Sequence, residues 1–338
     1  LGGNFEIVSR ETTLLANNVL LLVAAGSVML GTLYPLLVDA LNLGKISVGP
    51  PYFEAVFVPL MAPAVFLIGV GPVARWKKAS LPALAVLLRW AFAISIVAAG
   101  IVPFIMGEWK PMVSFGLLLA FWVVASMLVN IRHRLQSSGE GGLITRLMKQ
   151  SRSYYGMHCA HLGIAVFIVG VTLVNGYETE KDVRMEIGST VTLKDYTFQF
   201  NGTQPVSGPN YNASQGQVGI FKDGKKIKDL LPEKRTYTAS GMPMTEAAVD
   251  MGFLRDLYVA LGEPLENGAW IVRVYHKPFV NWIWFGCMLM ALGGILSVSD
   301  RRYRLAISKK FGRKSATVKA EVSDVADVPA KGMVITNS

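Results

Sequence analysis

Two of the four histidines in the chain lie three residues apart within an apolar run. His158 and His161 belong to the stretch Tyr154–Val174, which is long enough to cross a bilayer, since a crossing takes about 20 residues. Imidazole groups are unfavourable in hydrocarbon and usually mark a site there. Residues three apart lie on neighbouring positions of one helix face. Because neutral imidazole is a common ligand of haem iron, the segment predicts a membrane-embedded cofactor site, or half of one.

His161 is the stronger candidate of the two. The helical rise places it about 10 Å inward from Tyr154, beyond the interface on the predicted cytosolic side. Small residues such as Ala160 and Gly163 flank it, and they would admit either a flat macrocycle or a neighbouring helix. A histidine hydrogen-bonded between helices, without a cofactor, is the alternative that composition alone leaves equally open. His158 lies nearer the end of the run, where it could face lipid headgroups, and we do not expect it to be a ligand.

The other two histidines have simpler explanations. His276 precedes a pair of tryptophans at the start of an apolar segment, so we expect an exposed interfacial residue. His133 belongs to a basic cluster and should be solvated. The sequence contains no GxSxG, HExxH or P-loop motif, and no GxGxxG motif after a strand. No pair of carboxylates suggests hydrolytic chemistry.

Composition indicates a membrane protein. Of 338 residues, 52% are hydrophobic and 17% are charged, which is too apolar for an ordinary soluble protein. Six apolar segments are long enough to span a bilayer, and the third could extend backwards from Leu81 as an interfacial helix. They are Leu14–Leu41, Phe53–Val73, Arg89–Met106, Met112–Ile131, Tyr154–Val174 and Phe279–Val298.

The positive charge is distributed along the chain in a way that predicts its orientation. The formal net charge is +10, and most basic clusters flank apolar runs. They lie between the second and third segments, between the fourth and fifth, and after the sixth, whereas the alternate short loops carry one lysine each. The positive-inside rule therefore places both termini in the cytosol. No basic stretch is interleaved with aromatic residues, so we do not expect nucleic-acid binding.

One long loop has a different composition from the rest of the chain. Residues 175–278 contain alternating stretches that predict strands, a hairpin turn of the Asp-Gly type, and one segment that could form a short helix or turn. The strands are Val191–Phe200, Gln217–Phe221 and Trp270–Tyr275, the turn is Asp223-Gly224, and the helix or turn is Asp250–Gly262. About 100 residues suffice for a small β-rich domain with its own core.

The expected fold is an α-helical integral membrane protein of about six transmembrane helices with a small β-rich extracytoplasmic domain inserted. Its parts are a cytosolic N-terminal segment (1–13), five transmembrane helices (14–174), the β-rich domain (175–278), the last transmembrane helix (279–298) and a basic, partly disordered cytosolic tail (299–338). The chain begins at Leu1 without an initiator methionine or a signal sequence. We therefore expect it to be part of a longer polypeptide or the product of a split gene.

Several stretches together resemble the C-terminal half of the CcmF/NrfE family of cytochrome c-type biogenesis proteins, the haem lyases. The resemblance covers nearly everything except the tail. It is carried by Ser9-Arg-Glu-Thr-Thr-Leu-Leu-Ala-Asn-Asn18, Leu30-Gly-Thr-Leu-Tyr-Pro35, Leu43-Gly-Lys-Ile-Ser-Val-Gly-Pro-Pro-Tyr-Phe53, Gly69-Val-Gly-Pro-Val-Ala-Arg-Trp76, Ala160-His-Leu-Gly-Ile-Ala-Val166, Glu180-Lys-Asp-Val-Arg-Met185, Glu233-Lys-Arg-Thr-Tyr237, Met244-Thr-Glu-Ala-Ala248, Arg255-Asp-Leu-Tyr-Val-Ala-Leu-Gly262, Glu266-Asn-Gly-Ala-Trp270 and Lys277-Pro-Phe-Val-Asn-Trp-Ile-Trp284.

The resemblance implies a multi-pass protein of the bacterial inner membrane with its β-rich domain in the periplasm. It implies a part in attaching haem, delivered by a haem chaperone, to the CxxCH motif of apocytochrome c. It also implies a b-type haem in the membrane, with quinol as a candidate electron donor. One axial ligand of that haem is the histidine of the family's Ala-His-Leu-Gly motif, which corresponds to His161 here.

The same resemblance indicates what this chain lacks. The family's tryptophan-rich haem-handling motif, its two external histidine ligands and the second membrane histidine lie upstream of the matched region. The resemblance therefore implies an N-terminal half, fused or separate, as a partner, together with the haem chaperone, apocytochrome c and the thiol-reducing and chaperone subunits that present it. This chain supplies at most one ligand, and its catalytic residues stay unassigned.

Two other functions fit the same sequence features. One is a membrane transporter or channel component with His161 in a proton or substrate path. Transporters typically contain inverted repeats, and we see no repeat in this sequence. The other is a structural assembly subunit without a bound cofactor, in which His161 is a core residue.

Overall fold

The structure is a computed structural model that describes residues 8–76, 79–136 and 142–300 of the chain. The predicted cytosolic tail from residue 301 onward, and residues 1–7 of the predicted N-terminal segment, lie outside the described residues. Within the described part, six helices are long and apolar enough to cross a membrane, and a β domain follows the fifth of them. The prediction of a helical membrane protein with an inserted β-rich domain is therefore confirmed.

The long helices lie close to the apolar segments of the sequence, and a short helix, α5, stands between the fourth and fifth of them. Their bounds are α1 (Arg10–Ala40), α2 (Pro50–Val70), α3 (Leu81–Ile105), α4 (Pro111–Gln136), α5 (Leu143–Met148), α6 (Arg152–Tyr177) and α7 (Val280–Val298). The third is one continuous helix from Leu81, without a break at Arg89. Serine side chains cap the N-termini of two helices. The Ser9 hydroxyl accepts a hydrogen bond of 3.2 Å from the Thr12 amide in α1, and the Ser151 hydroxyl accepts one of 3.2 Å from the Tyr154 amide in α6.

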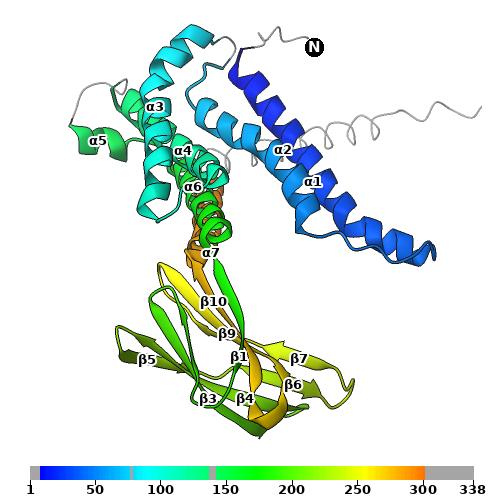
Figure 1. The fold of residues 1–338 in the computed structure, drawn as a ribbon. Helices are drawn as coiled ribbons and strands as arrows, with labels where there is room; N and C mark the ends of the chain where they lie inside the picture. Colours follow the sequence, from blue (N-terminus) through cyan, green and yellow to red (C-terminus); the bar gives the residue numbers. More distant parts are fainter. Residues whose placement is uncertain (1–7, 77–78, 137–141, 301–338) are drawn as a thin grey trace, which may run out of the picture.

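The helices form two groups (Figure 1). α3, α4, α6 and α7 make a bundle, and α1 and α2 form an antiparallel pair beside it. Trp122 on α4 joins the groups, because its indole stacks on Phe66 of α2 at 5.0 Å between ring centroids and donates a hydrogen bond of 2.9 Å to the Phe66 carbonyl. This contact holds α2 against the bundle next to α6.

Glycines bring α6 and α7 into backbone contact. A Cβ atom on Gly163 would lie 2.7 Å from the Gly286 carbonyl oxygen, and one on Gly293 would lie 2.5 Å from the Ala160 nitrogen. Small residues permit such close approach between membrane helices, where van der Waals packing drives association. Of the two uses that the sequence left open for the small residues near His161, the structure shows the second, a neighbouring helix.

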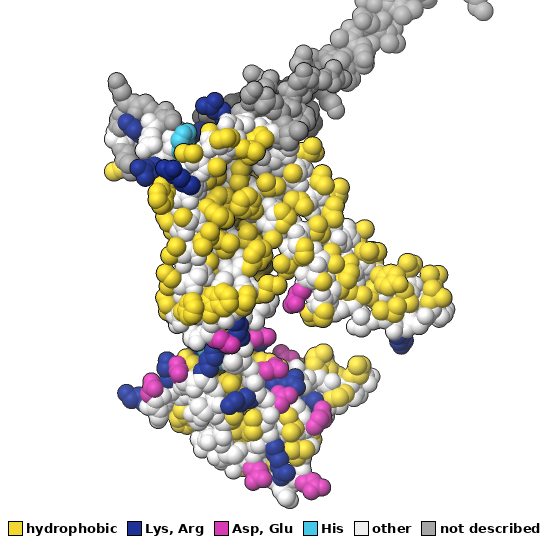
Figure 2. All heavy atoms as spheres, turned by 45° about the horizontal axis from the view of Figure 1, so that its top comes forward, with side chains coloured by type: hydrophobic (Ala, Val, Ile, Leu, Met, Phe, Trp, Pro, Cys, Tyr) yellow, Lys and Arg dark blue, Asp and Glu magenta, His cyan; other side chains and the backbone are white. Residues whose placement is uncertain are grey.

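The β domain is a sandwich of two antiparallel sheets. It lies at one end of the helices, where charged side chains replace the apolar surface of the helices (Figure 2). The first sheet has the order β1-β10-β9-β8. The second has the order β2-β3-β4-β6-β7, with β5 paired to β4. The strands are β1 (Thr179–Met185), β2 (Thr190–Leu193), β3 (Tyr196–Ser207), β4 (Tyr211–Lys222), β5 (Lys225–Leu230), β6 (Glu233–Tyr237), β7 (Pro243–Glu246), β8 (Ala248–Asp250), β9 (Arg255–Pro264) and β10 (Trp270–Pro278). Because α6 enters β1 and β10 leads into α7, two covalent connections fix the domain to the bundle.

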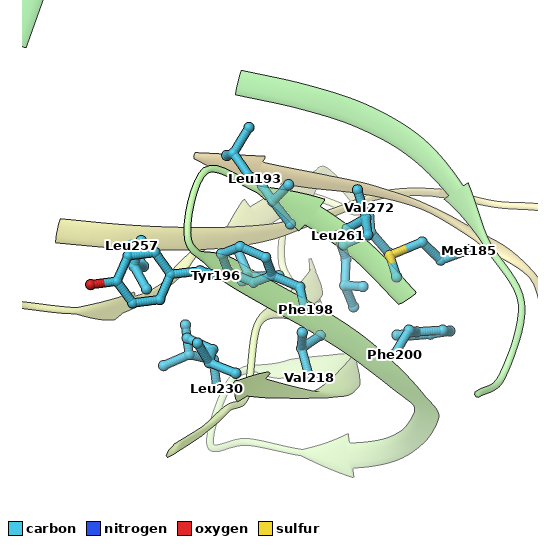
Figure 3. Packing of buried hydrophobic residues seen from close by; sticks show 14 of the residues in the cluster. Met185, Leu193, Tyr196, Phe198, Phe200, Val218, Leu230, Leu257, Leu261 and Val272 are labelled. Atoms are coloured by element: carbon cyan, nitrogen blue, oxygen red, sulfur yellow. The ribbon is translucent and has the colours of Figure 1, made fainter. Parts of the chain in front are cut away.

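The core of this domain lies between the two sheets (Figure 3). Phe198 and Phe200 from β3 face Leu257 and Leu261 from β9, and none of the four side chains is exposed to solvent. Their alternation along each strand puts one face of each sheet into the core. The domain therefore has its own hydrophobic core, separate from the helices.

Two local predictions in this domain are wrong. Val191–Phe200 is not one strand, because Lys194 adopts a left-handed conformation (φ 51°) and turns the chain between β2 and β3. Asp250–Gly262 is not a short helix or a turn, because it runs from the last residue of β8 through a four-residue loop into β9, which takes up most of the segment. The apolar side chains at Leu257, Val259 and Leu261 alternate, which is the period of a strand buried on one face.

The predicted Asp-Gly hairpin is confirmed between β4 and β5, where Asp223 and Gly224 both have positive φ (50° and 72°). Both angles are positive in a type I′ turn.

Gly224→Val should therefore destabilise the β domain by about 1–2 kcal/mol, the penalty of a left-handed non-glycine residue. The measurement is urea-dependent proteolysis of the detergent-purified protein. Asp223→Asn is the matched control and should be near neutral, so equal shifts in the two variants would contradict this reading of the turn.

Candidate functional site

His158 and His161 face the same small void where α2, α4 and α6 meet. The void is narrow and has no room for a water molecule. Its lining comes from α2 and the turn after it, from α4, and from the two histidines of α6. The lining residues are Ile68, Gly69, Pro72, Val123, Ser126, Met127, Asn130, His158 and His161. The structure therefore brings together the two histidines that helical spacing placed on one face.

The position of His158 differs from the sequence-based expectation. Its side chain does not face headgroups, because only 8% of the residue is exposed. The ring packs edge-on against Tyr154, with 4.3 Å between centroids. Neither ring nitrogen has a hydrogen-bond partner in the described part of the chain. The reason for the burial is tertiary: α2 and α4 cover a helix end that the sequence alone leaves open.

His161 is half-buried and its imidazole makes no hydrogen bond within the described residues. The alternative of a core histidine hydrogen-bonded between helices predicts such a bond. An imidazole without one has a nitrogen lone pair available to a metal. The role of His161 as a ligand stays a prediction.

Sequence reasoning missed a polar network beside the histidines. The Asn130 side-chain amide of α4 donates to the Pro72 carbonyl at 3.1 Å, and its oxygen accepts from the Tyr154 hydroxyl at 3.2 Å. The guanidinium of Arg134 lies 4.9 Å from the centroid of the Tyr154 ring. The signal was an asparagine within an apolar segment, where an unpaired amide is unfavourable. The network fixes the ends of α2, α4 and α6 around the void.

A second, larger cavity adjoins the void and shares Pro72 and Asn130 with it. It measures about 380 Å³ and is lined mainly by polar residues of α1, α4 and α6. Its lining residues are Arg10, Pro72, Asn130, Arg134, Ser151, Ser153, Tyr154, Met157 and Ser297. Two arginines make this cavity electropositive, at the end of the bundle that faces away from the β domain.

The donor chemistry here suits one axial ligand of a haem, but the void does not enclose a macrocycle. Pockets that enclose a ligand of drug size measure about 300–1,000 Å³, whereas the void beside His161 has no room even for a water molecule. No group of three or more His, Cys, Asp or Glu side chains gathers in the described ranges as a metal site. A haem at His161 therefore needs a second ligand and further walls from outside these residues.

The remaining histidines lie away from the void. His133 is exposed at the end of α4, as expected. His276 on β10 is half-buried near the Tyr196 ring, at 6.0 Å between centroids, so the expectation of an exposed interfacial residue is wrong. Burial and the nearby Lys194 ammonium lower the pKa of His276 below its usual value. The turn between β2 and β3, which carries Lys194 and leads into Tyr196, lies beside this side chain.

Asp256 connects the β domain to the first turn of α7. The residue is 2% exposed, and its carboxylate accepts hydrogen bonds of 3.0 Å from the Gly252 amide and from the Asn281 side chain. Burial raises the pKa of Asp256, and the Gly252 hydrogen bond opposes that rise in part. An ionised carboxylate at this place thus lowers stability at neutral pH, and protonation in the acid range removes the penalty.

Asp256→Asn should raise the unfolding temperature at neutral pH, because the amide oxygen keeps both hydrogen bonds and the buried charge is gone. The difference from wild type should narrow as the pH falls. Asp182→Asn is a control of opposite sign, since the hydrogen bond from Arg273 lowers the pKa of the exposed Asp182. That variant should lose a small amount of stability at neutral pH and none in acid. Thermal unfolding in detergent at neutral and at acid pH tests both variants. An unfolding temperature of Asp256→Asn that is below that of wild type by the same amount at both pH values would contradict the account.

Comparisons with known proteins agree with this architecture. Residues 176–278 match the family model described as the CcmF C-terminal beta-sandwich. The chain is 48% identical over 306 residues to the cytochrome c-type biogenesis protein CcmF of Pseudomonas aeruginosa, covering 90% of this chain and 46% of that protein. It is 44% identical to CcmF of Escherichia coli over the same shares, and 31% identical to NrfE of Haemophilus influenzae, covering 88% and 45%.

A solved structure shares the fold. The cytochrome c haem lyase CcmF matches with a TM-score of 0.69 at 22% identity, over 87% of this chain and 46% of that one. The chain spans about half the length of the curated relatives that it matches. On these findings, the chain belongs to the CcmF family of cytochrome c-type biogenesis proteins and corresponds to its C-terminal half.

Proposed function

We propose that this chain is the C-terminal part of a cytochrome c haem lyase. It would take part in the transfer of haem from a haem chaperone to the CxxCH thiols of apocytochrome c, as part of a longer chain or complex. Membership of the CcmF family supports the general role in cytochrome c maturation. The observation that carries the proposal for this half is His161, whose imidazole has no hydrogen bond in the described part of the chain and faces a void between three membrane helices.

The proposed cofactor is a b-type haem, for which His161 would supply one axial ligand. A haem supplies one-electron chemistry when it is bound, and its potential depends on its axial ligands and burial. The chain's own residues would orient the imidazole and exclude water. Trp122 holds α2 against α4, the Asn130 network fixes the helix ends, and α7 supports α6 from the other side. The second ligand would come from the N-terminal half.

The proposed location is the bacterial inner membrane, with the β domain in the periplasm and both termini of this chain in the cytosol. The arrangement of charges supports this orientation. Arg134, Arg146 and Arg152 gather at the end of α4, α5 and α6, and α6 leads from there to the β domain at its other end. The positive-inside rule assigns the arginine-rich end to the cytosol.

The proposed role can be tested in cells that lack this protein. We expect apocytochrome c to accumulate and covalently bound haem, detected by haem staining of denatured c-type cytochromes, to disappear. Restoring the chain, with its N-terminal half where that is encoded separately, should restore the stain. Unchanged c-type cytochromes in the deletion strain would contradict the proposal.

A further inference from the structure

Three large apolar side chains project from the loop between β8 and β9. Met251, Phe253 and Leu254 are 73%, 70% and 56% exposed in the described structure. The loop lies at that end of the β1-β10-β9-β8 sheet which is next to the helices. Arg255 at the start of β9 pairs with Pro278 at the end of β10, and α7 begins two residues after Pro278. These side chains are therefore at the level where the chain passes from the β domain into α7.

The first turn of α7 fixes this loop through three successive backbone carbonyls. The Gly252 carbonyl accepts from the Asn281 side chain at 2.7 Å, and the Phe253 carbonyl accepts from the Trp282 indole at 3.1 Å. The Leu254 carbonyl accepts from the Phe279 amide at 2.9 Å. The loop is thus attached to the membrane helix and cannot move away from it without breaking these bonds.

The charged residues that flank the loop are paired at its base. The Arg255 guanidinium contacts the Asp250 carboxylate at 2.6 Å and donates to the Tyr196 hydroxyl at 2.9 Å. The Gly252 amide donates to the Asp256 carboxylate. Backbone groups without partners are strongly unfavourable in lipid, and here the carbonyls of Gly252, Phe253 and Leu254 already have partners within the protein. The side chains that the tip exposes are hydrocarbon or thioether, without charge.

The tip also extends an existing aromatic interface. The Phe253 ring lies 5.7 Å from the Trp282 ring, between centroids, and Trp284, two residues further along α7, is 66% exposed. Tryptophans at the ends of spanning helices sit at the headgroup level of the bilayer. The loop holds Met251, Phe253 and Leu254 beside these tryptophans. Their side chains are therefore at the depth of the boundary between headgroups and acyl chains.

We propose that Met251, Phe253 and Leu254 insert into the outer headgroup–acyl boundary of the membrane, so that a lipid surface is the partner of this loop. The insertion would hold the β domain at a fixed height and tilt on the bilayer, in addition to its two covalent connections. The bond from Asn281 sets the depth of the loop. The proposal concerns lipid contact and does not depend on the bound cofactor.

The test is a spin label at Phe253→Cys in the full-length protein, with Cys159 and Cys287 replaced by alanine, in nanodiscs of phosphatidylethanolamine and phosphatidylglycerol. Collision rates with oxygen, which concentrates in lipid, and with a water-soluble nickel chelate report the depth of the label. We expect a several-fold higher oxygen-to-nickel ratio than for a label at Met242→Cys. Met242 is the matched control because it is 67% exposed and lies in the hairpin between β6 and β7.

Two results would overturn the proposal. A nickel accessibility equal to that of the Met242 control would place the loop in water, and low accessibility to both reagents would mean that protein covers it. Photoreactive benzoylphenylalanine at position 253 gives a second readout that needs no cysteine replacement. It should cross-link to phospholipid, whereas cross-linking to protein alone would contradict the proposal. In Asn281→Ala, the label should become more mobile and less deep.

Discussion

Gly293→Val is expected to stop the protein from accumulating in the membrane. A Cβ atom at this position would lie 2.5 Å from the Ala160 nitrogen and 2.5 Å from the Gly156 carbonyl oxygen. Both are backbone atoms of α6, so no side chain can rotate away and the two helices must separate. Overpacking of this kind destabilises by about 1–3 kcal/mol, and by more where backbone has to move.

The neighbouring glycine provides the control for this prediction. A Cβ atom on Gly294 would meet nothing within 4 Å, and the residue is exposed on the same helix. Gly294→Val should therefore accumulate like wild type. The measurement is the amount of folded protein in the membrane fraction, together with its unfolding temperature in detergent. Equal losses in the two variants would show that valine, rather than the α6–α7 contact, causes the defect.

His161→Ala is expected to abolish covalent haem attachment to c-type cytochromes while the protein still accumulates. Substitution removes the one imidazole of the void that corresponds to the family's ligand motif, and an axial ligand governs both retention and potential of a b-type haem. The side chain makes no hydrogen bond in the described part of the chain, so its removal should disturb the helices little. Haem staining of cytochromes and immunodetection of the protein measure the two quantities separately.

His158→Ala is the matched control on the same helix. His158 is more buried than His161 and packs on Tyr154, so its removal leaves a cavity and should lower stability by about 1–3 kcal/mol. Cytochrome maturation should persist in this variant. If His158→Ala abolished maturation at normal protein levels and His161→Ala did not, the roles assigned to the two residues would have to be exchanged.

The helices and the hairpin could be predicted from local sequence, because local properties determine them. A run of apolar residues defines a segment such as Pro111–Gln136, and the glycine of Asp223-Gly224 tolerates the left-handed turn. The prediction failed in Asp250–Gly262, which was expected to form a short helix or turn. The alternating Leu257, Val259 and Leu261 belong instead to a strand of the sandwich core.

The arrangement of the site depends on contacts that no local pattern contains. Sequence spacing placed His158 and His161 on one face of α6, but not which helices cover that face. Burial of His158 follows from the approach of α2 and α4, which Trp122 and Asn130 hold in place. The small residues beside His161 were compatible with a macrocycle or a helix, and only the position of Gly286 on α7 distinguishes the two.

The most direct test of the central claim is a reduced-minus-oxidised absorbance spectrum of the detergent-purified complex that contains this chain and its N-terminal half. Wild type, His161→Ala and His158→Ala would be compared at equal protein concentration. We predict a b-type haem signal in wild type and in His158→Ala, and its loss or shift in His161→Ala alone. An unchanged haem signal in His161→Ala would contradict the assignment of this residue as an axial ligand and would favour a core histidine without a cofactor.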